Sequence, residues 1–245
     1  KSSHISDFSY LYEKNSSSKS HFFYKLDKKI DLGNFEDSKL KLKIEKTSND
    51  TYLKSNKLQS PIILSETVLE NSLSFDMSSA DTSINTEFRV YESLDKKKSD
   101  RYEFILPKIE FVKKLENKTP LIGDFQFISN NFIKNYETNI FEKVNINDII
   151  FNSNPKISKF GFYNNYDFII KNVNSDSQNS IIYKKDQNHY LSSLFQFNSS
   201  LPLIKDQGNL QKIFKPKLAL KISPENTKDI SNEETRLDVN NIFNL

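Results

Sequence analysis

The 245-residue chain contains no cysteine and only four glycines. Without cysteine there can be no disulfide framework, no thiolate nucleophile and no cysteine-ligated metal. The few glycines leave little room for phosphate-cradling loops, and the sequence has no P-loop, GxGxxG or GxSxG motif. No apolar run approaches the roughly 18 residues that a membrane-spanning helix needs. These absences exclude several enzyme classes and helical membrane spans.

Histidine and acidic residues also lack a catalytic pattern. The three histidines, His4, His21 and His189, are scattered, and no HExxH motif or paired ligand spacing joins them. The adjacent Glu233 and Glu234 are typical of solvated loop charges rather than of a glycosidase pair. We therefore expect no catalytic residue, no cofactor site and no metal site, and we do not expect an enzyme.

Positive and negative charges nearly cancel. The chain has 35 basic and 32 acidic residues, a formal net charge of +3. Its bias toward Lys, Asn, Ile, Phe and Ser is explained by A/T-rich codons, so the slight excess of positive charge does not indicate a nucleic-acid partner. The 20 Phe and 11 Tyr are too many for a disordered chain. The composition therefore indicates a folded protein.

Short segments in which apolar and polar residues alternate one for one recur along the chain. They are clearest at residues 40–45, 73–77 and 218–222. Successive side chains of a strand point to opposite faces, so this period predicts an all-β, antiparallel sheet with an apolar and a wet side. A spacing of roughly 20 residues for strand plus turn predicts about a dozen strands.

Several extended segments are closer to the roughly 9 to 11 residues of a tilted membrane strand than to the usual 5 or 6. Two architectures agree with the pattern: a transmembrane β-barrel, whose lumen is wet, and a soluble β-sandwich. Pro107 predicts either a boundary between two segments or a bulge, because proline cannot donate to a strand ladder. Polar composition predicts loops at residues 172–180, 205–209 and 224–234.

Several short motifs stand in the order in which they occur in the barrel of one bacterial family. Residues 47–54 (TSNDTYLK) resemble its S-(D/N)-D-x-Y-L stretch, and residues 101–107 (RYEFILP) resemble its Y-x-x-x-L-P strand. The alternating segment 64–76 is similar to its long strands.

The C-terminal part continues this resemblance. Residues 201–224 are similar to an R-P…E-P-x…P region, although Leu201 and Lys215 stand where Arg and Glu are common, and residues 238–243 resemble a D-x-x-N-I/L-F segment. The chain is thus similar to the LptD family of lipopolysaccharide (LPS) assembly proteins, also called organic solvent tolerance proteins.

This resemblance implies that residues 1–245 are part of a single outer-membrane β-barrel domain, incomplete, with about a dozen strands of a larger barrel. The N-terminal periplasmic jellyroll and the C-terminal barrel strands of the family would be absent. The implied activity is transport without chemistry: the barrel delivers LPS to the outer leaflet through a lateral opening. The implied partners are LPS, outer-membrane lipid, an LptE-like lipoprotein plug and, through the missing N-terminal domain, an LptA-like bridge protein.

The alternation assigns candidate residues to two faces. Lys41, Lys43, Asp76 and Lys221 are expected to face the lumen. The lipid-facing candidates are Leu40, Leu42, Ile44, Phe75, Leu218 and Leu220. A charge at Leu42 should then be costly, whereas reversing Lys43 to Glu should be mild.

Other assignments agree with parts of the sequence. The run Lys96 to Lys98 could meet LPS phosphates but is more typical of a solvated loop. Another outer-membrane barrel, such as a porin or receptor, would share the alternation, and a secreted β-sandwich binding module would share the short strands.

Overall fold

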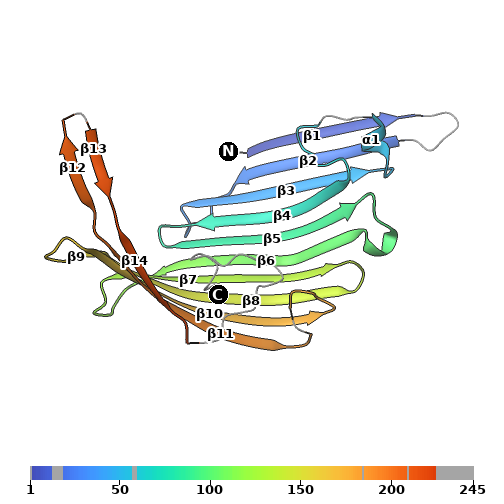
Figure 1. The fold of residues 1–245 in the computed structure, drawn as a ribbon. Coiled ribbons are helices and arrows are strands. Elements are labelled where there is room, and N and C mark those ends of the chain that lie inside the picture. The colour runs from blue at the N-terminus through green and yellow to red at the C-terminus, as the bar shows by residue number, and fades with distance from the viewer. Residues whose placement is uncertain (1, 13–18, 57–59, 184, 209, 225–245) are drawn as a thin grey trace. The chain divides into compact units, whose positions relative to one another are not determined.

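The computed structural model describes residues 2–12, 19–56, 60–183, 185–208 and 210–224. The chain is built almost entirely from β-strands (Figure 1), as the alternation predicts. The strands are β1 (Ser2–Leu11), β2 (Lys19–Lys29), β3 (Asp37–Thr47), β4 (Val68–Ser78), β5 (Thr82–Ser93), β6 (Tyr102–Leu115), β7 (Gly123–Tyr136), β8 (Ile140–Ser153), β9 (Lys156–Ile157), β10 (Tyr163–Gln178), β11 (Asn188–Ser200), β12 (Leu203–Gln207), β13 (Leu210–Phe214) and β14 (Lys217–Ile222).

Twelve of these strands form one antiparallel sheet, which confirms the all-β prediction and its strand number. The order is β1-β2-β3-β4-β5-β6-β7-β8-β10-β11-β14, with β9 paired to β10, while β12 and β13 form a separate hairpin. Helix within the described residues is limited to α1 (Tyr52–Asn56) and a 3-10 turn, η1 (Lys98–Asp100). Neither is long and apolar enough to cross a membrane.

The chain divides into two compact units. Unit 1 comprises residues 1–112, 129–145 and 174–188, and it contains β1 to β5 in full. Unit 2 comprises residues 113–128, 146–173 and 189–245. In unit 2 an aromatic row crosses neighbouring strands: ring centroids are 4.5 Å apart for Phe125 and Phe151, 5.7 Å for Phe151 and Tyr166, and 6.3 Å for Tyr166 and Phe195.

The register of β2 to β4 aligns the alternation of one strand with that of the next. Leu42 lies opposite Leu26 on β2 and Leu73 on β4, and Leu40 lies opposite Phe75. Directly paired residues share a face, so the apolar side chains form continuous rows across the strands. This agreement fixes the register, because a slip of one residue would move every apolar side chain to the opposite face.

An asparagine side chain extends the contact between β3 and β4 beyond the ladder. The backbone N–H of Glu45 donates to Asn71 Oδ1 at 3.0 Å, and Asn71 Nδ2 donates to the Glu45 carbonyl at 3.2 Å. The side-chain amide therefore satisfies both backbone groups of Glu45, as a neighbouring strand would.

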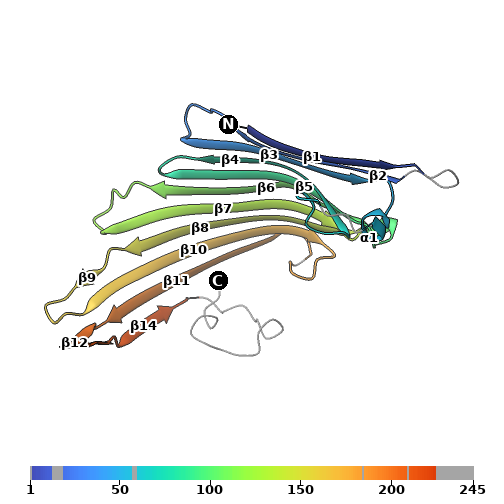
Figure 2. The ribbon, with the colours of Figure 1, turned by 90° about the horizontal axis from the view of Figure 1, so that it is seen from above.

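The buried core of unit 1 lies where the β3–β4 connection folds back onto the strands. Tyr52 and Leu53 of α1 are buried together with Phe23 of β2 and Leu69 of β4. Figure 2 shows α1 at one end of these strands. The core is thus formed by α1 and its flanking loop on the sheet rather than by a second sheet.

Several sequence predictions need correction. β1 was not among the predicted strands. Residues 172–178 are strand rather than loop, because their polar side chains bond within the sheet; Asn174 Nδ2, for example, donates to Asn145 Oδ1 at 3.1 Å. The loop predicted at 205–209 includes the end of β12, and the chain turns at Gly208, whose φ is +59°.

Pro107 lies inside a continuous β6, so the interpretation of a boundary between two segments is wrong. The motif at 238–243 and nearly all of the loop predicted at 224–234 lie outside the described residues.

Candidate functional site: an apolar and a charged face on the same strands

Strands β1 to β5 of unit 1 carry an apolar face. The register places on it Phe8, Tyr10, Phe22, Tyr24, Leu26, Leu40, Leu42, Ile44, Leu73, Phe75, Met77, Ile84, Phe88 and Val90. Four of the six lipid-facing candidates, Leu40, Leu42, Ile44 and Phe75, lie in the middle of this set.

The apolar face is open to its surroundings. Phe8 is 67% exposed, Phe22 and Phe88 are also exposed, and Leu40 and Leu42 are half-buried. Contiguous exposed apolar side chains mark a surface that contacts lipid or a partner protein. The face is therefore a candidate contact surface rather than a core.

The opposite side of the same strands is the charged face. It includes three of the lumen-facing candidates, Lys41, Lys43 and Asp76, with Glu45 of β3 and Glu70 of β4. Lys41 Nζ lies 2.6 Å from Asp76 Oδ2. The candidates of the two groups thus lie on two faces, although Lys28 and Lys46 share the apolar face and which face meets lipid stays a prediction.

Lys43 is the best-enclosed cation of the charged face, with a side chain that is 13% exposed. Its Nζ lies 2.9 Å from Glu45 Oε1 and 2.9 Å from Glu70 Oε2. Glu45 is itself buried, and its other carboxylate oxygen accepts the backbone N–H of Glu70 at 2.6 Å. One lysine therefore bridges two carboxylates of neighbouring strands.

Arg89 of β5 extends this network. Its Nε lies 3.3 Å from Glu70 Oε1, its Nη1 donates to Tyr91 Oη at 2.6 Å, and it also pairs with Glu87. The sequence prediction did not include Glu45, Glu70, Glu87 or Arg89. Alternation alone could have placed Glu87 and Arg89 on one face of β5, but their partners depend on the register.

The charged face surrounds a hollow of about 330 Å³. The hollow is lined by equal numbers of cationic and anionic side chains. The cations are Lys25, Lys41, Lys43 and Arg89, and the anions are Asp27, Glu70, Asp76 and Glu87. Because these charges pair with one another, the hollow is a polar surface of balanced charge and has no excess of cations that would bind an anion. No group of three His, Asp or Glu side chains in the described part of the chain could hold a metal ion.

The remaining candidates lie on β14 in unit 2. Leu218 and Leu220 are exposed and share one face, on which Leu220 pairs with Phe197 of β11. Lys221 lies on the other face, opposite Gln196. The register of β14 thus separates Lys221 from Leu218 and Leu220, while their assignment to lumen and lipid stays a prediction.

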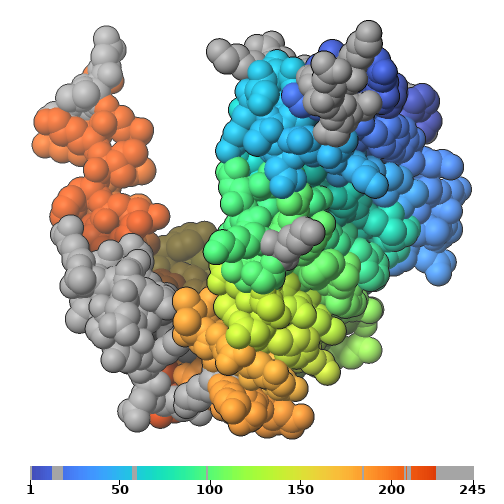
Figure 3. All heavy atoms as spheres, turned by 90° about the vertical axis from the view of Figure 1, so that its right-hand side faces the viewer, coloured from blue at the N-terminus to red at the C-terminus, as the bar shows by residue number. Residues whose placement is uncertain are grey.

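Ion pairs hold the segment around α1 against the rest of unit 1. Arg101 Nη1 donates to Asp50 Oδ2 at 2.8 Å, and Arg101 Nε donates to Glu92 Oε1 at 2.7 Å. Lys54 Nζ lies 2.7 Å from Asp95. Hydrogen bonding to Asp50 raises the pKa of Arg101, and the same contact lowers the pKa of Asp50. Figure 3 faces the end of unit 1 at which this segment lies, in light blue.

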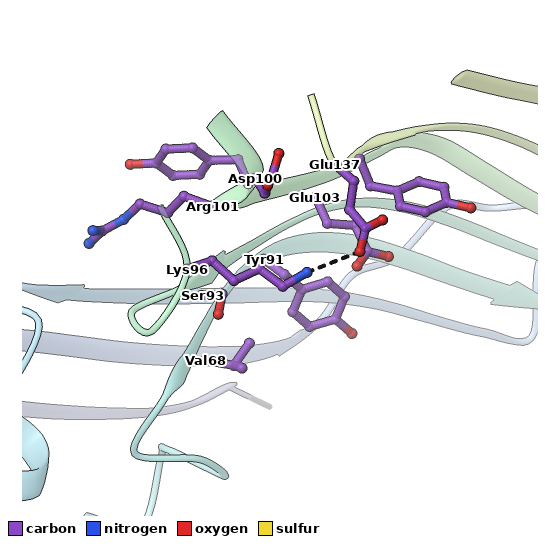
Figure 4. Close-up of a pocket in the computed structure, with 10 residues that line it drawn as sticks. Val68, Tyr91, Ser93, Lys96, Asp100, Arg101, Glu103 and Glu137 are labelled. Carbon is purple, nitrogen blue, oxygen red and sulfur yellow. Dashed lines mark hydrogen bonds and ion pairs between the residues drawn. The ribbon is translucent and has the colours of Figure 1, made fainter. Parts of the chain in front are cut away.

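Lys96, from the predicted lysine run, lies beside a second hollow of about 340 Å³ (Figure 4). Its Nζ pairs with Glu137 at 3.2 Å, and Tyr91, Tyr136 and Arg101 also line the hollow. The lysine is about half exposed and already has an anionic partner. The position of Lys96 is therefore typical of a solvated lysine in a loop and not of a lysine held ready to bind phosphate.

Neither the models of known protein families nor the curated proteins gave a significant match to this sequence.

Proposed function

We propose that this chain is part of an antiparallel β-barrel of the bacterial outer membrane that delivers LPS to the outer leaflet. The observation that carries the proposal is the inversion of the usual arrangement in unit 1. Phe8, Phe22 and Phe88 of the apolar face are exposed, whereas Glu45 and Lys43 are enclosed on the opposite face. A soluble sheet buries its apolar face, whereas a membrane barrel turns that face to lipid and encloses its polar face.

Strand length and hydrogen bonding support the same proposal. β1 to β5 are 10 to 12 residues long, close to the 9 to 11 or so that cross a bilayer at a tilt. Inside a membrane each backbone polar group needs a partner in the sheet, which a closed barrel supplies. A β-sandwich would need a second sheet over the apolar face, and the exposure of Phe8 and Phe22 argues against one.

The choice of LPS as cargo rests on the resemblance to the LptD family. Two of the motifs that carry it meet in unit 1, where Asp50 of the first motif pairs with Arg101 of the second. Tyr52 and Leu53 of the first motif are buried in the same region. The partners that follow are LPS, outer-membrane lipid, an LptE-like plug and an LptA-like bridge protein.

Cysteine scanning tests the orientation of the faces, and the native chain contributes no background cysteine. Leu42→Cys and Lys41→Cys are adjacent on β3 and belong to opposite faces. Each variant, labelled with a small fluorophore in lipid vesicles, is exposed to a quencher attached to lipid acyl chains. We expect quenching at position 42 and little at position 41. Equal quenching, or the reverse pattern, would contradict a lipid-facing apolar surface.

Depletion of the protein in its own bacterium tests the cargo. LPS should disappear from the cell surface and accumulate inside the envelope, while other outer-membrane proteins still assemble. If surface LPS is unchanged in cells whose envelope lacks the protein, the LPS assignment is wrong. The cysteine experiment would still report on the barrel, and solute uptake would then test the porin or receptor alternative.

A further inference from the structure

An aspartate, a histidine and a serine come together at one end of β1 and β2. Asp7 and Ser9 are two residues apart on β1 and therefore share a face. Ser9 lies directly opposite His21 of β2 in the antiparallel ladder, and Asp7 lies opposite Phe23, the next residue of β2 on that face. The histidines are scattered in the sequence, so only the hairpin register brings these three groups together.

The three side chains form a chain of hydrogen bonds. Ser9 Oγ lies 2.9 Å from His21 Nδ1, and His21 Nε2 lies 3.2 Å from Asp7 Oδ1. A single tautomer satisfies both contacts: Nε2–H donates to the carboxylate, and the unprotonated Nδ1 accepts from the serine hydroxyl. In this state the imidazole can accept the serine proton, and the carboxylate stabilises the imidazolium that results.

Packing holds the imidazole in place. His21 is 3% exposed, and its ring stacks on Phe23 with centroids 4.5 Å apart and planes inclined by 22°. Ser9, by contrast, is only half-buried. The Tyr52 hydroxyl of α1 hydrogen-bonds to Ser9 Oγ, which places another polar group beside the serine. An enclosed base beside a more accessible hydroxyl is the arrangement that nucleophilic catalysis requires.

We propose that Ser9, His21 and Asp7 form a nucleophilic relay that hydrolyses carboxylic esters. Phe23, which stacks on His21, and Tyr52, which hydrogen-bonds to Ser9, are buried and hold the relay in place. This inference stands apart from LPS delivery and adds a reaction to a chain for which the sequence predicts none.

The reaction runs in two steps. Ser9 Oγ forms a bond to the ester carbonyl carbon while His21 Nδ1 takes the serine proton. The carbon–oxygen bond to the alcohol then breaks, and the alcohol leaves with the proton from His21. In the second step a water molecule gives a proton to His21 and attacks the acyl-serine. The carboxylic acid is released as Ser9 recovers its proton.

The test uses membranes from cells that make the full chain, treated with a fluorophosphonate, which labels activated serines covalently. We expect labelling of Ser9, located by mass spectrometry of the peptide, and hydrolysis of p-nitrophenyl butyrate. Ser9→Ala should abolish the label and lower hydrolysis at least about 100-fold, and His21→Asn should slow labelling by a similar factor. Unfolding midpoints of the variants separate lost chemistry from lost folding.

Ser6→Ala is the matched control, because Ser6 lies on β1 but on the apolar face, opposite Tyr24. It should leave labelling and hydrolysis unchanged. Absence of label on Ser9 in the folded chain would overturn the proposal. Labelling that persists at full rate in a folded His21→Asn variant would also overturn it, since the serine would then react without the relay.

Discussion

Replacement of Lys43 by methionine tests the ion-pair network of the charged face. Methionine keeps most of the apolar stem of lysine but removes the ammonium that bridges Glu45 and Glu70. Lys41 provides a matched control on the same face of β3, two residues away. Its side chain is 49% exposed where it pairs with Asp76, against 13% for Lys43. Both substitutions therefore remove an ammonium group, one from an enclosed site at position 43 and the other from an exposed site at position 41.

The expected costs follow from this difference. A hydrogen bond to a charged group contributes about 1.5–3 kcal/mol, and Lys43 donates one to Glu70 and forms an ion pair with Glu45. Glu70 keeps Arg89 as a partner, and Glu45 keeps the backbone N–H of Glu70, so part of this stabilisation remains. We expect Lys43→Met to lower the free energy of unfolding by about 3 kcal/mol. Lys41→Met should cost no more than about 1 kcal/mol, as for an exposed pair.

Urea titration of the refolded chain in detergent micelles measures both costs, from midpoints at an unchanged m-value. Equal costs for the two substitutions would refute the argument from enclosure. The structure also changes the expectation for Lys43→Glu. That substitution adds a third carboxylate beside Glu45 and Glu70, so it should cost more than Lys43→Met rather than be mild.

Three further predictions concern other parts of the chain. In lipid vesicles, Leu42→Arg should lower stability by about 2 to 4 kcal/mol if position 42 lies near the middle of the bilayer, as refolding titrations would show. Gly123→Ala should cost about 1 to 3 kcal/mol by the same measurement, because a Cβ there would press against the carbonyl oxygen of Asn152. Arg101→Gln should release Asp50 and speed protease cleavage within residues 48–67. Folding lowers the pKa of Asp50 below 3.8. The ion pair with Arg101 therefore stabilises the fold above that pH, and this stabilisation is lost as the pH falls through the pKa of the folded chain. Urea midpoints of Arg101→Gln should accordingly fall less between neutral and acid pH than those of the unmodified chain.

The alternation of the sequence was sufficient to predict strand type and the separation of side chains in the middle of the sheet. Lys41 and Leu42 fall on opposite faces, as the period of two requires. The same reasoning failed at residues 172–178, where asparagine and serine are typical of turns. There the side chains bond to neighbouring strands, as Asn174 does to Asn145, and local propensity has less influence than these contacts.

Contacts between distant segments could not be predicted from local pattern. Asp50 and Arg101 are 51 residues apart, and their pairing depends on the return of the β3–β4 connection to the sheet. Ser9 and His21 meet because of the hairpin register, and β1 was missed because few of its residues alternate clearly. The signal that could have found it is short: Phe8 and Tyr10 alternate with Asp7 and Ser9.

If the charged face lines the lumen of the proposed barrel, the balance of charge around its hollow has a consequence for permeation. Four cations match four anions there, so the electrostatic potential seen by a passing molecule is weak and changes little with ionic strength. A lumen lined in this way would select by size and by capacity for hydrogen bonding rather than by the sign of charge. It would let a large amphiphile that carries both sugars and phosphates slide past without being held at any one point.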